Sequence, residues 1–259
     1  MKKSYAVVTG ASSGIGECFA RRLAKEGYSL VLVARRKERL NRLADELKAE
    51  GTHVVIETAD LSKKDECLRL MSALGDKRIG VFINNAGFGD CGRFADTSLD
   101  KDLDMIDVNI RAVHILTKLV LRKMRSQGGG YLLNVASSAG LIPAGPYMAT
   151  YYASKAYVAS MTRAVARELR EEGSQVYVGA LCPGPVNTEF NSVANVEFAL
   201  PEITPEYCAN YAVDQMKRRR TVIVPTFTLK AATTLGRFIP QSAYIAIAGH
   251  QQKKKLARK

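Results

Sequence analysis

The feature that most constrains the fold is an alternation of short apolar runs with longer amphipathic segments. The first apolar run, residues 5–9, precedes helical periodicity over residues 14–26, and the second run, residues 30–33, precedes an amphipathic stretch that stops at Gly51. Strands that are apolar on both faces need cover on both faces, and intervening helices supply it. The pattern predicts an α/β fold: a doubly wound, Rossmann-type parallel sheet with helices on both faces.

The remaining apolar runs extend this pattern to seven strands. We expect strands at 54–56, 81–83, 131–135, 176–181 and 222–224, and helices at roughly 63–74, 100–126 and 152–172. Since no linker, composition break or repeat interrupts the chain, we expect one domain over residues 1–249. A substrate lid is expected at about 186–215 and a basic tail at 250–259.

Charge and composition exclude several classes of protein. The 259 residues hold 38 Lys and Arg against 25 Asp and Glu, a net charge of +13, and residues 250–259 supply five of the cations. No nucleic-acid motif accompanies this charge, so we interpret the tail as solvated and expect no nucleic-acid partner. The five Cys form no C-x-x-C and no His/Cys cluster has metal-ligand spacing, which predicts a reducing cytoplasm and no metal site.

Two interpretations are compatible with the apolar segment 222–249, whose charged residues are Lys230 and Arg237 alone. It could attach the protein to a membrane surface, or it could form the last strand and a core helix. We favour the strand and core helix, because Pro225 and Pro240 interrupt any long helix. No apolar stretch approaches the roughly 18 residues that span a bilayer, so no stable membrane insertion is expected.

A glycine-rich turn follows the first apolar run. Gly10, Gly14 and Gly16 stand in a G-x-x-x-G-x-G spacing between an expected strand and an expected helix. Glycines at such a turn let the backbone approach a pyrophosphate and present helix N-terminal amides to it, although a ligand-free turn would use the same residues. The sequence favours a dinucleotide site.

The end of the second apolar run indicates which dinucleotide. An NAD site normally has an acid there for the ribose hydroxyl, but this chain has Ala34 followed by Arg35 and Arg36. Two guanidiniums are suited to a 2′-phosphate. The sequence therefore predicts NADP(H).

Tyr151 and Lys155 stand four residues apart on an expected helix, so they share one face. An ammonium near a phenol favours the phenolate, so this spacing predicts a lowered pKa for Tyr151 and a role in proton transfer. Such a pair alone is commonly a surface contact. The neighbouring Tyr152 has Ala156 at the matching position, and we expect it to pack.

Several motifs occur together in the order and spacing of one family. They are TGASSGIG at 9–16, ADL at 59–61, NNAG at 84–87, Asn109, SSAG at 137–140, YYASK at 151–155 and PGPVNT at 183–188. Over nearly its whole length the chain resembles the short-chain dehydrogenase/reductase family. The finer match, LVARRKERL and PYMATYYASKAYV, resembles bacterial members of unassigned substrate.

The resemblance implies a catalytic set of Asn109, Ser137, Tyr151 and Lys155. Tyr151 would be the acid/base, and Lys155 would lower its pKa and bind the nicotinamide ribose. Asn109 would hold a water that links Lys155 to solvent. A Ser would bind the substrate oxygen: the spacing to Tyr151 points to Ser138, whereas the strand register points to Ser137. We choose Ser137 with Ser138 in reserve, because a loop tolerates an inserted residue and a strand does not.

The resemblance also implies a cofactor-binding set. Asp60 would accept from the adenine amino group, residues 85–87 would line the adenosine, and Thr188 would contact the carboxamide or a phosphate. Asp60 could instead be a helix cap, and Asn85 and Asn109 turn or cap residues. With Tyr151 and Lys155, the set comprises Gly10, Ser12, Ser13, Gly14, Ile15, Gly16, Arg35, Arg36, Asp60, Leu61, Asn85, Ala86, Gly87, Pro183, Gly184, Val186 and Thr188.

Together these residues predict an NADP(H)-dependent oxidoreductase that interconverts a carbonyl and an alcohol, with reduction as the direction in the cell. The alternative is an NADP(H)-binding regulatory protein that has the fold without turnover. An apolar, medium-sized ketone or aldehyde, such as a ring ketone, a steroid-like ketone or an acyl chain, is the expected substrate. Its contacts would include Ser137, Tyr147, Tyr151 and Phe190, and the same wall offers Met148, Val193, Phe198 and Tyr211, although many of these could pack the lid itself.

The resemblance implies a homodimer or homotetramer formed through the helices near 100–126 and 152–172. An apolar stripe of Val158, Met161, Val165 and Leu169 on the second of these helices could serve that interface, or it could face the sheet.

Overall fold

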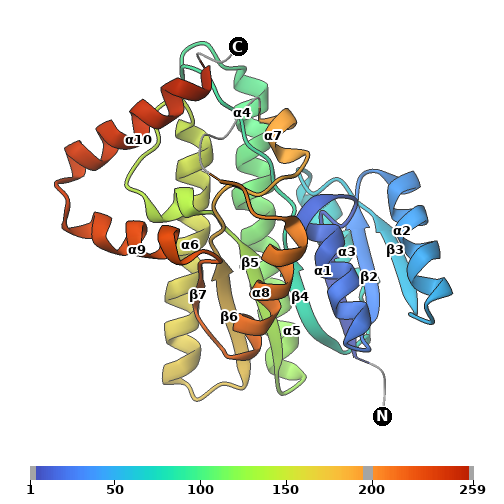
Figure 1. The fold of residues 1–259 in the computed structure, drawn as a ribbon. Coiled ribbons are helices and arrows are strands. Elements are labelled where there is room, and N and C mark those ends of the chain that lie inside the picture. Colours follow the sequence, from blue (N-terminus) through green and yellow to red (C-terminus); the bar gives the residue numbers. More distant parts are fainter. Residues whose placement is uncertain (1–3, 195–200, 257–259) are drawn as a thin grey trace.

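Among the residues that the computed structural model describes, 4–194 and 201–256, seven strands form one all-parallel sheet in the order β3-β2-β1-β4-β5-β6-β7 (Figure 1). This confirms the predicted fold class. The chain reverses direction of winding between β1 and β4, which pair with each other. The strands are β1 (Tyr5–Thr9), β2 (Ser29–Ala34), β3 (Val54–Thr58), β4 (Ile79–Asn84), β5 (Gly130–Val135), β6 (Val176–Leu181) and β7 (Val222–Ile223).

Helices cover both faces of this sheet because successive strand residues point to opposite sides. In β1, Ala6 and Val8 pack into one core and Val7 into the other, and all three are fully buried. The first core lies under α1 (Gly14–Lys25), α2 (Lys37–Ala49) and α8 (Pro205–Lys217). The second lies under α3 (Lys64–Ala73), α5 (Val113–Ser126) and α6 (Ala149–Glu171).

The single helix expected over 100–126 contains a π-helical turn. It comprises α4 (Leu99–Ile106), the turn at Asp107–Ala112 and α5. Short π-helical turns, in which hydrogen bonds join residues five apart, are frequent at functional sites in helices. Here the turn holds a fully buried Asn109. The amphipathic pattern predicts a helix but does not reveal this local change of winding.

The segment expected to be a lid is only partly separate from the core. After the short helix α7 (Phe190–Val193), helix α8 begins at Pro205 and packs against α1. Cys208, Ala209 and Ala212 of α8 are fully buried. The segment predicted as a lid, 186–215, therefore includes most of a helix whose apolar face packs in the first core, and its role as a lid stays a prediction.

The C-terminal region also differs from expectation. After β7 the chain forms α9 (Phe227–Leu235), a 3₁₀ turn at Gly236–Phe238 and α10 (Gln241–Leu256), and these elements project from the body in Figure 1. The predicted boundary at residue 249 falls inside α10, so residues 250–256 continue a helix. The predicted core helix is wrong too, since Phe227 and Phe238 are each 85% exposed.

The apolar stripe on α6 faces inward. Val158 and Leu169 are buried in the cores, and Met161 and Val165 pack against them. Of the two uses that the sequence left open, the structure shows packing toward the sheet, so this stripe gives no support to an oligomer interface.

Candidate active site

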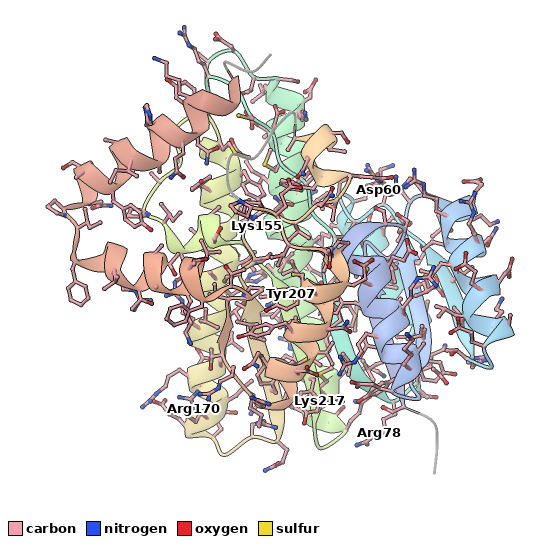
Figure 2. All side chains as sticks on the ribbon, in the orientation of Figure 1. Asp60, Arg78, Lys155, Arg170, Tyr207 and Lys217 are labelled. Carbon is pink, nitrogen blue, oxygen red and sulfur yellow. The ribbon has the colours of Figure 1, made fainter. Side chains whose placement is uncertain are left out.

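One cavity of about 1070 Å³ lies at the carboxyl ends of the strands, where parallel sheets bind ligands. Its walls come from the turns after β1, β2, β3, β4, β5 and β6, together with α6, α7, α9 and α10. Asp60 and Lys155 both lie toward this end, whereas Arg78, Arg170 and Lys217 lie at the opposite end (Figure 2).

The glycine loop after β1 is shaped by close backbone contacts. Gly10 has φ +66° and Gly14 has φ +57°, a region that side chains rarely adopt. A Cβ on Gly16 would lie 2.2 Å from the carbonyl oxygen of Gly10. The N-cap of α1, Ser13, makes no side-chain cap, so the first amides of α1 remain for an anion at the helix N-terminus. These features fit a dinucleotide pyrophosphate.

Thr9 and Asn85 hold this loop against the end of β4. The Thr9 hydroxyl accepts from the backbone N–H groups of Asn85 and Ala86 at 2.9 and 3.0 Å. The Asn85 amide donates to the carbonyl oxygens of Thr9 and Gly10 at 3.0 and 3.3 Å. Asn85 therefore acts as the turn residue that the sequence left as an alternative, while it also lines the cavity.

The arginines after β2 face the same cavity. Arg36 donates to the hydroxyls of Ser12 and Ser13 and forms an ion pair with Glu189 at 2.8 Å. Arg39 pairs with the same carboxylate. These two hydrogen-bonded guanidiniums hold the pKa of Glu189 at about 2. A cluster of cations thus stands beside the loop, partly neutralised by one acid.

Asp60 lies beside Arg35 at the end of β3. Partial burial raises the pKa of Asp60, but hydrogen bonds from Ser62 and the charge of Arg35 outweigh it, so the pKa is lowered overall. The Asp60 carboxylate accepts from the backbone N–H and hydroxyl of Ser62 at 3.2 and 2.9 Å. Asp60 is not the helix cap, because α3 begins after Lys63.

Tyr151 lies on the first turn of α6 and meets Ser137 from the end of β5. Burial is the main influence on the Tyr151 phenol and raises its pKa to about 12, although a hydrogen bond with Ser137 lowers it in part. The prediction of a lowered pKa for Tyr151 is therefore wrong in this geometry, because the free-energy cost of burying a phenolate exceeds the stabilisation that its neighbours give the phenolate. Both Ser137 and Ser138 line the cavity, so the choice of Ser137 stays a prediction.

Lys155 is 4% exposed and donates to the carbonyl oxygen of Val135 at 3.0 Å. Its ammonium lies 5.9 Å from the centre of the Tyr151 ring, and burial lowers its pKa to about 8. Asn109 is close by: a Cβ on Gly87 would meet both the Asn109 oxygen and the Lys155 nitrogen. The Asn109 amide accepts from the N–H of Phe88 and donates to its carbonyl oxygen and to Ser154.

Most of the predicted site residues line the cavity. Those that do not are Gly16, which packs on Gly10, Asn109, which is buried behind Phe88, and Tyr147, which lies in a smaller pocket with Asp90 and Asp102. The lining residues are Gly10, Ser12, Ser13, Gly14, Ile15, Arg35, Arg36, Asp60, Leu61, Asn85, Ala86, Gly87, Ser137, Tyr151, Lys155, Pro183, Gly184, Val186, Thr188 and Phe190.

The side expected to hold substrate is apolar with a few polar atoms. Phe190 packs on Tyr151 with ring centres 5.4 Å apart, and Met148 and Val193 also line the cavity. Tyr211 packs instead on the first core and stacks on Tyr207, and Phe198 lies outside the described residues.

Sequence reasoning missed a link between α6 and α10. The buried Gln252 amide donates to the Tyr152 hydroxyl at 2.6 Å and also lines the cavity. Its amide oxygen has no hydrogen-bond partner among the described residues, and neither has that of Asn191. The hydrophobic pattern gave no signal for Gln252, because it lies in the segment read as a solvated tail.

Comparison with known proteins identifies the family. The family profile described as short chain dehydrogenase matches residues 4–197. A very-long-chain 3-oxoacyl-CoA reductase of Anas platyrhynchos is 35% identical over 216 residues, which is 81% of this chain and 68% of that protein. An uncharacterized oxidoreductase of Staphylococcus epidermidis is 35% identical over 73% of this chain and 80% of its own length.

Solved structures agree with the fold. A short-chain dehydrogenase from Sphingobium yanoikuyae in complex with NADPH is 33% identical, with a TM-score of 0.80 over 92% of this chain and 97% of that chain. A short-chain dehydrogenase/reductase from Burkholderia phymatum in complex with NAD is 27% identical, with a TM-score of 0.83 over 92% and 94%.

The chain belongs to the short-chain dehydrogenase/reductase family. It is an oxidoreductase that acts on a carbonyl or alcohol group with NAD(P)(H). In the part of the chain that the structure describes, no helix is long and apolar enough to cross a bilayer.

Proposed function

We propose that this protein is an NADP(H)-dependent reductase of apolar ketones or aldehydes, with Tyr151 as the proton donor. The observation that carries the proposal is the meeting of Tyr151, Ser137 and Lys155 in a cavity that continues to the glycine loop. When bound there, the dinucleotide would supply or accept the hydride. The residues of this chain would orient the substrate carbonyl and provide its proton.

The protonation state of Tyr151 supports reduction as the direction. Because burial raises the pKa of Tyr151 to about 12, the phenol is neutral near pH 7 and holds a proton to donate. The Ser137 hydroxyl beside it would hydrogen-bond the same substrate oxygen. Lys155, with a pKa of about 8, would be mostly an ammonium near pH 7 and would bind the ribose hydroxyls.

The preference for NADP(H) rests on this chain's own charges, since its relatives bind either dinucleotide. Ala34 occupies the position of the acid that an NAD ribose would use, and Arg35 and Arg36 line the cavity beside it. Arg36 already donates to Ser12 and Ser13 on the glycine loop. A 2′-phosphate would accept from the same guanidinium, with Arg39 as a further cation that we add to the site.

Apolar walls support an apolar substrate. Ile142, Met148, Phe190, Leu235 and Ile247 line the cavity beyond Tyr151. The relatives include proteins named for a very-long-chain 3-oxoacyl-CoA and for a 17-beta-hydroxysteroid. The unpartnered oxygens of two buried amides would accept from a hydroxyl or N–H group on such a molecule.

A panel of aliphatic, steroid and acyl ketones and aldehydes, followed by the loss of NADPH absorbance, tests this proposal. We expect turnover on apolar members of the panel, and loss of that turnover in Tyr151→Phe. Binding of NADPH without turnover on any member would instead favour the alternative of a regulatory protein. Preferential turnover with NADH would contradict the cofactor assignment alone.

A further inference from the structure

The region after β7 exposes more large apolar side chains than a solvated surface requires. Phe227 and Phe238 are each 85% exposed, Leu235 is 64% exposed, and Ile239 and Ile247 are 40% and 50% exposed. Four of them come from α9, the 3₁₀ turn and α10, which project from the body in Figure 1, and Ile239 directly follows the turn. We call these five side chains the C-terminal patch. Exposed apolar side chains gathered on one segment indicate a surface that binds a partner or a membrane.

The charge around the C-terminal patch has one sign. No Asp or Glu follows Asp214 in the sequence, and residues 226–259 hold seven Lys and Arg. Of these, Lys230, Arg237 and Lys253 are exposed on α9, the 3₁₀ turn and α10. None of these three forms an ion pair with a carboxylate of residues 4–194 or 201–256. The surface thus combines exposed apolar side chains with unneutralised cations.

This combination decides between the possible occupants. A second copy that packed its own α9–α10 segment on this one would bring cation against cation, because neither segment holds an acid to face Lys230 or Arg237. An anionic lipid surface satisfies both features, since aromatic and aliphatic side chains enter the headgroup boundary and Lys and Arg meet the phosphates. We propose that the C-terminal patch docks this protein peripherally on an anionic phospholipid membrane.

The position of the cavity gives this docking a use. Leu235, Ile239 and Ile247 belong to the C-terminal patch and also line the cavity. The cavity mouth would therefore lie at the docked face, where an apolar molecule dissolved in the bilayer could enter without crossing water. This use rests on the proposed reductase function, whereas the docking itself does not depend on catalysis.

The chain contains no tryptophan, which allows a direct test. All tryptophan fluorescence of a variant then comes from the single indole that is introduced. The probe variant is Phe238→Trp in the full chain. The matched control is Leu68→Trp, which replaces a 42% exposed residue of α3, toward the β3 edge and away from α9 and α10 in Figure 1. Each variant is mixed with vesicles of phosphatidylcholine alone or of phosphatidylcholine with one quarter phosphatidylglycerol.

We expect the emission of Phe238→Trp to shift to shorter wavelength, and its quenching by acrylamide to fall, only with the anionic vesicles. Leu68→Trp should show neither change. Added salt should reverse the shift in part, because it screens the cations. No shift for Phe238→Trp, or equal shifts in both variants, would overturn the proposal. A shift that grows with protein concentration without vesicles would also overturn it, in favour of a second copy.

Two further double variants separate the contribution of the aromatic side chains to vesicle binding from that of the cations, in a vesicle co-sedimentation assay. Phe227→Ser with Phe238→Ser should lower the partition coefficient by about tenfold or more. Lys230→Gln with Arg237→Gln should lower it by about tenfold at low salt and less at high salt. Circular dichroism of each variant verifies the fold. NADPH binding should remain unchanged in both. A loss of vesicle binding is therefore distinguishable from a defect of the cofactor site. Unchanged partitioning of both folded double variants would contradict the assignment to the C-terminal patch.

Discussion

Tyr151 and Tyr152 are neighbours in the sequence but have different partners. Tyr151 meets Ser137 and lies under the Lys155 ammonium, whereas the Tyr152 hydroxyl accepts from Gln252 of α10. Both are buried on the first turn of α6. Their hydroxyls therefore serve different purposes, one at the proposed reacting carbonyl and one as a link between helices.

We predict that Tyr151→Phe lowers kcat by about 10²–10⁴ or more, because it removes the positioned proton donor and leaves the ring in place. NADPH affinity should stay near that of the unaltered protein, as measured by fluorescence titration. The matched control Tyr152→Phe should keep its turnover but lose about 1–3 kcal/mol of stability, because the Gln252 amide loses its partner. Near-normal turnover in Tyr151→Phe would contradict the assigned role.

The arginines beside the glycine loop lead to a second prediction. Arg35→Ala with Arg36→Ala should weaken NADPH binding by about 1.5–3 kcal/mol for each charge-assisted hydrogen bond lost, and NADH binding much less. Calorimetric titration of both dinucleotides measures the difference. Tighter binding of NADH than of NADPH by the unaltered protein would refute the preference.

Glu189→Gln is the matched variant for this test. Glu189 pairs with Arg36 and Arg39, and a 2′-phosphate would compete with it for the same guanidiniums. Removing its charge should therefore tighten NADPH binding and leave NADH binding unchanged. Weaker NADPH binding in Glu189→Gln would show that the carboxylate positions the arginines instead of competing with the phosphate.

At the scale of elements, a buried chain of polar side chains joins β4, β5, α5 and α6. The Asn134 oxygen accepts from Asn84 and Thr117 at 3.0 and 3.1 Å, and its amide donates to Thr162 at 2.9 Å. All four residues are at most 3% exposed. Satisfied networks of this kind fix the relative positions of elements, here the strands and helices that carry Ser137 and Tyr151.

We predict that Asn134→Ala lowers the free energy of unfolding by about 2–4 kcal/mol, because it leaves a cavity and up to three buried groups without their partner. Asn41→Ala on the exposed side of α2 is the control and should change stability by less than about 0.5 kcal/mol. Urea unfolding followed by circular dichroism measures both. Equal effects in the two variants would show that the network contributes little.

The elements also show how far the sequence could predict the structure. The strand positions and the glycine loop were predictable, because buried parallel strands are apolar throughout and a phosphate turn needs residues such as Gly10 that adopt positive φ. The direction in which the pKa of Tyr151 shifts was not predictable, since it depends on how deeply the phenol is buried. The exposure of Phe227 and Phe238 was also unpredictable, because an apolar segment ordinarily indicates a buried helix, whereas these two side chains are exposed.

At the scale of the whole molecule, assembly remains a prediction. Leu99, Leu103 and Ile106 form an exposed apolar row on α4, and Tyr157 of α6 is 37% exposed. This row replaces the inward-facing α6 stripe as the candidate surface for a homodimer or homotetramer. We expect light scattering to give an oligomer, and Leu99→Glu with Leu103→Glu to convert it to a monomer near 28 kDa. A monomer in the unaltered protein at micromolar concentration would refute this.

The last prediction concerns alkaline pH and arises from many buried groups together. Burial raises the pKa of the Cys67 thiol to about 11 and those of Cys182 and Cys208 to about 12, from an ordinary value of 9.0. It also raises the pKa of Tyr151 and Tyr152 to about 12, from 10.0. A raised pKa means that the folded chain keeps protons that the unfolded chain releases, so the stability from these groups is complete below pH 9 and falls as the pH rises toward 12.

Lys155 acts in the opposite sense, because burial lowers its pKa from 10.5 to about 8 and the folded state is relieved of a buried charge between those values. The gain in stability with rising pH comes from one lysine, whereas the loss comes from several thiols and phenols. We therefore expect the Tm to fall by about 5 °C or more between pH 9 and pH 11. Thermal unfolding in the presence of a reducing agent, followed by circular dichroism, measures this without thiol oxidation. In Lys155→Met the fall should begin at a lower pH and be steeper, because the opposing contribution is removed. A Tm that stays constant to pH 11 would show that these groups are not buried as the structure places them.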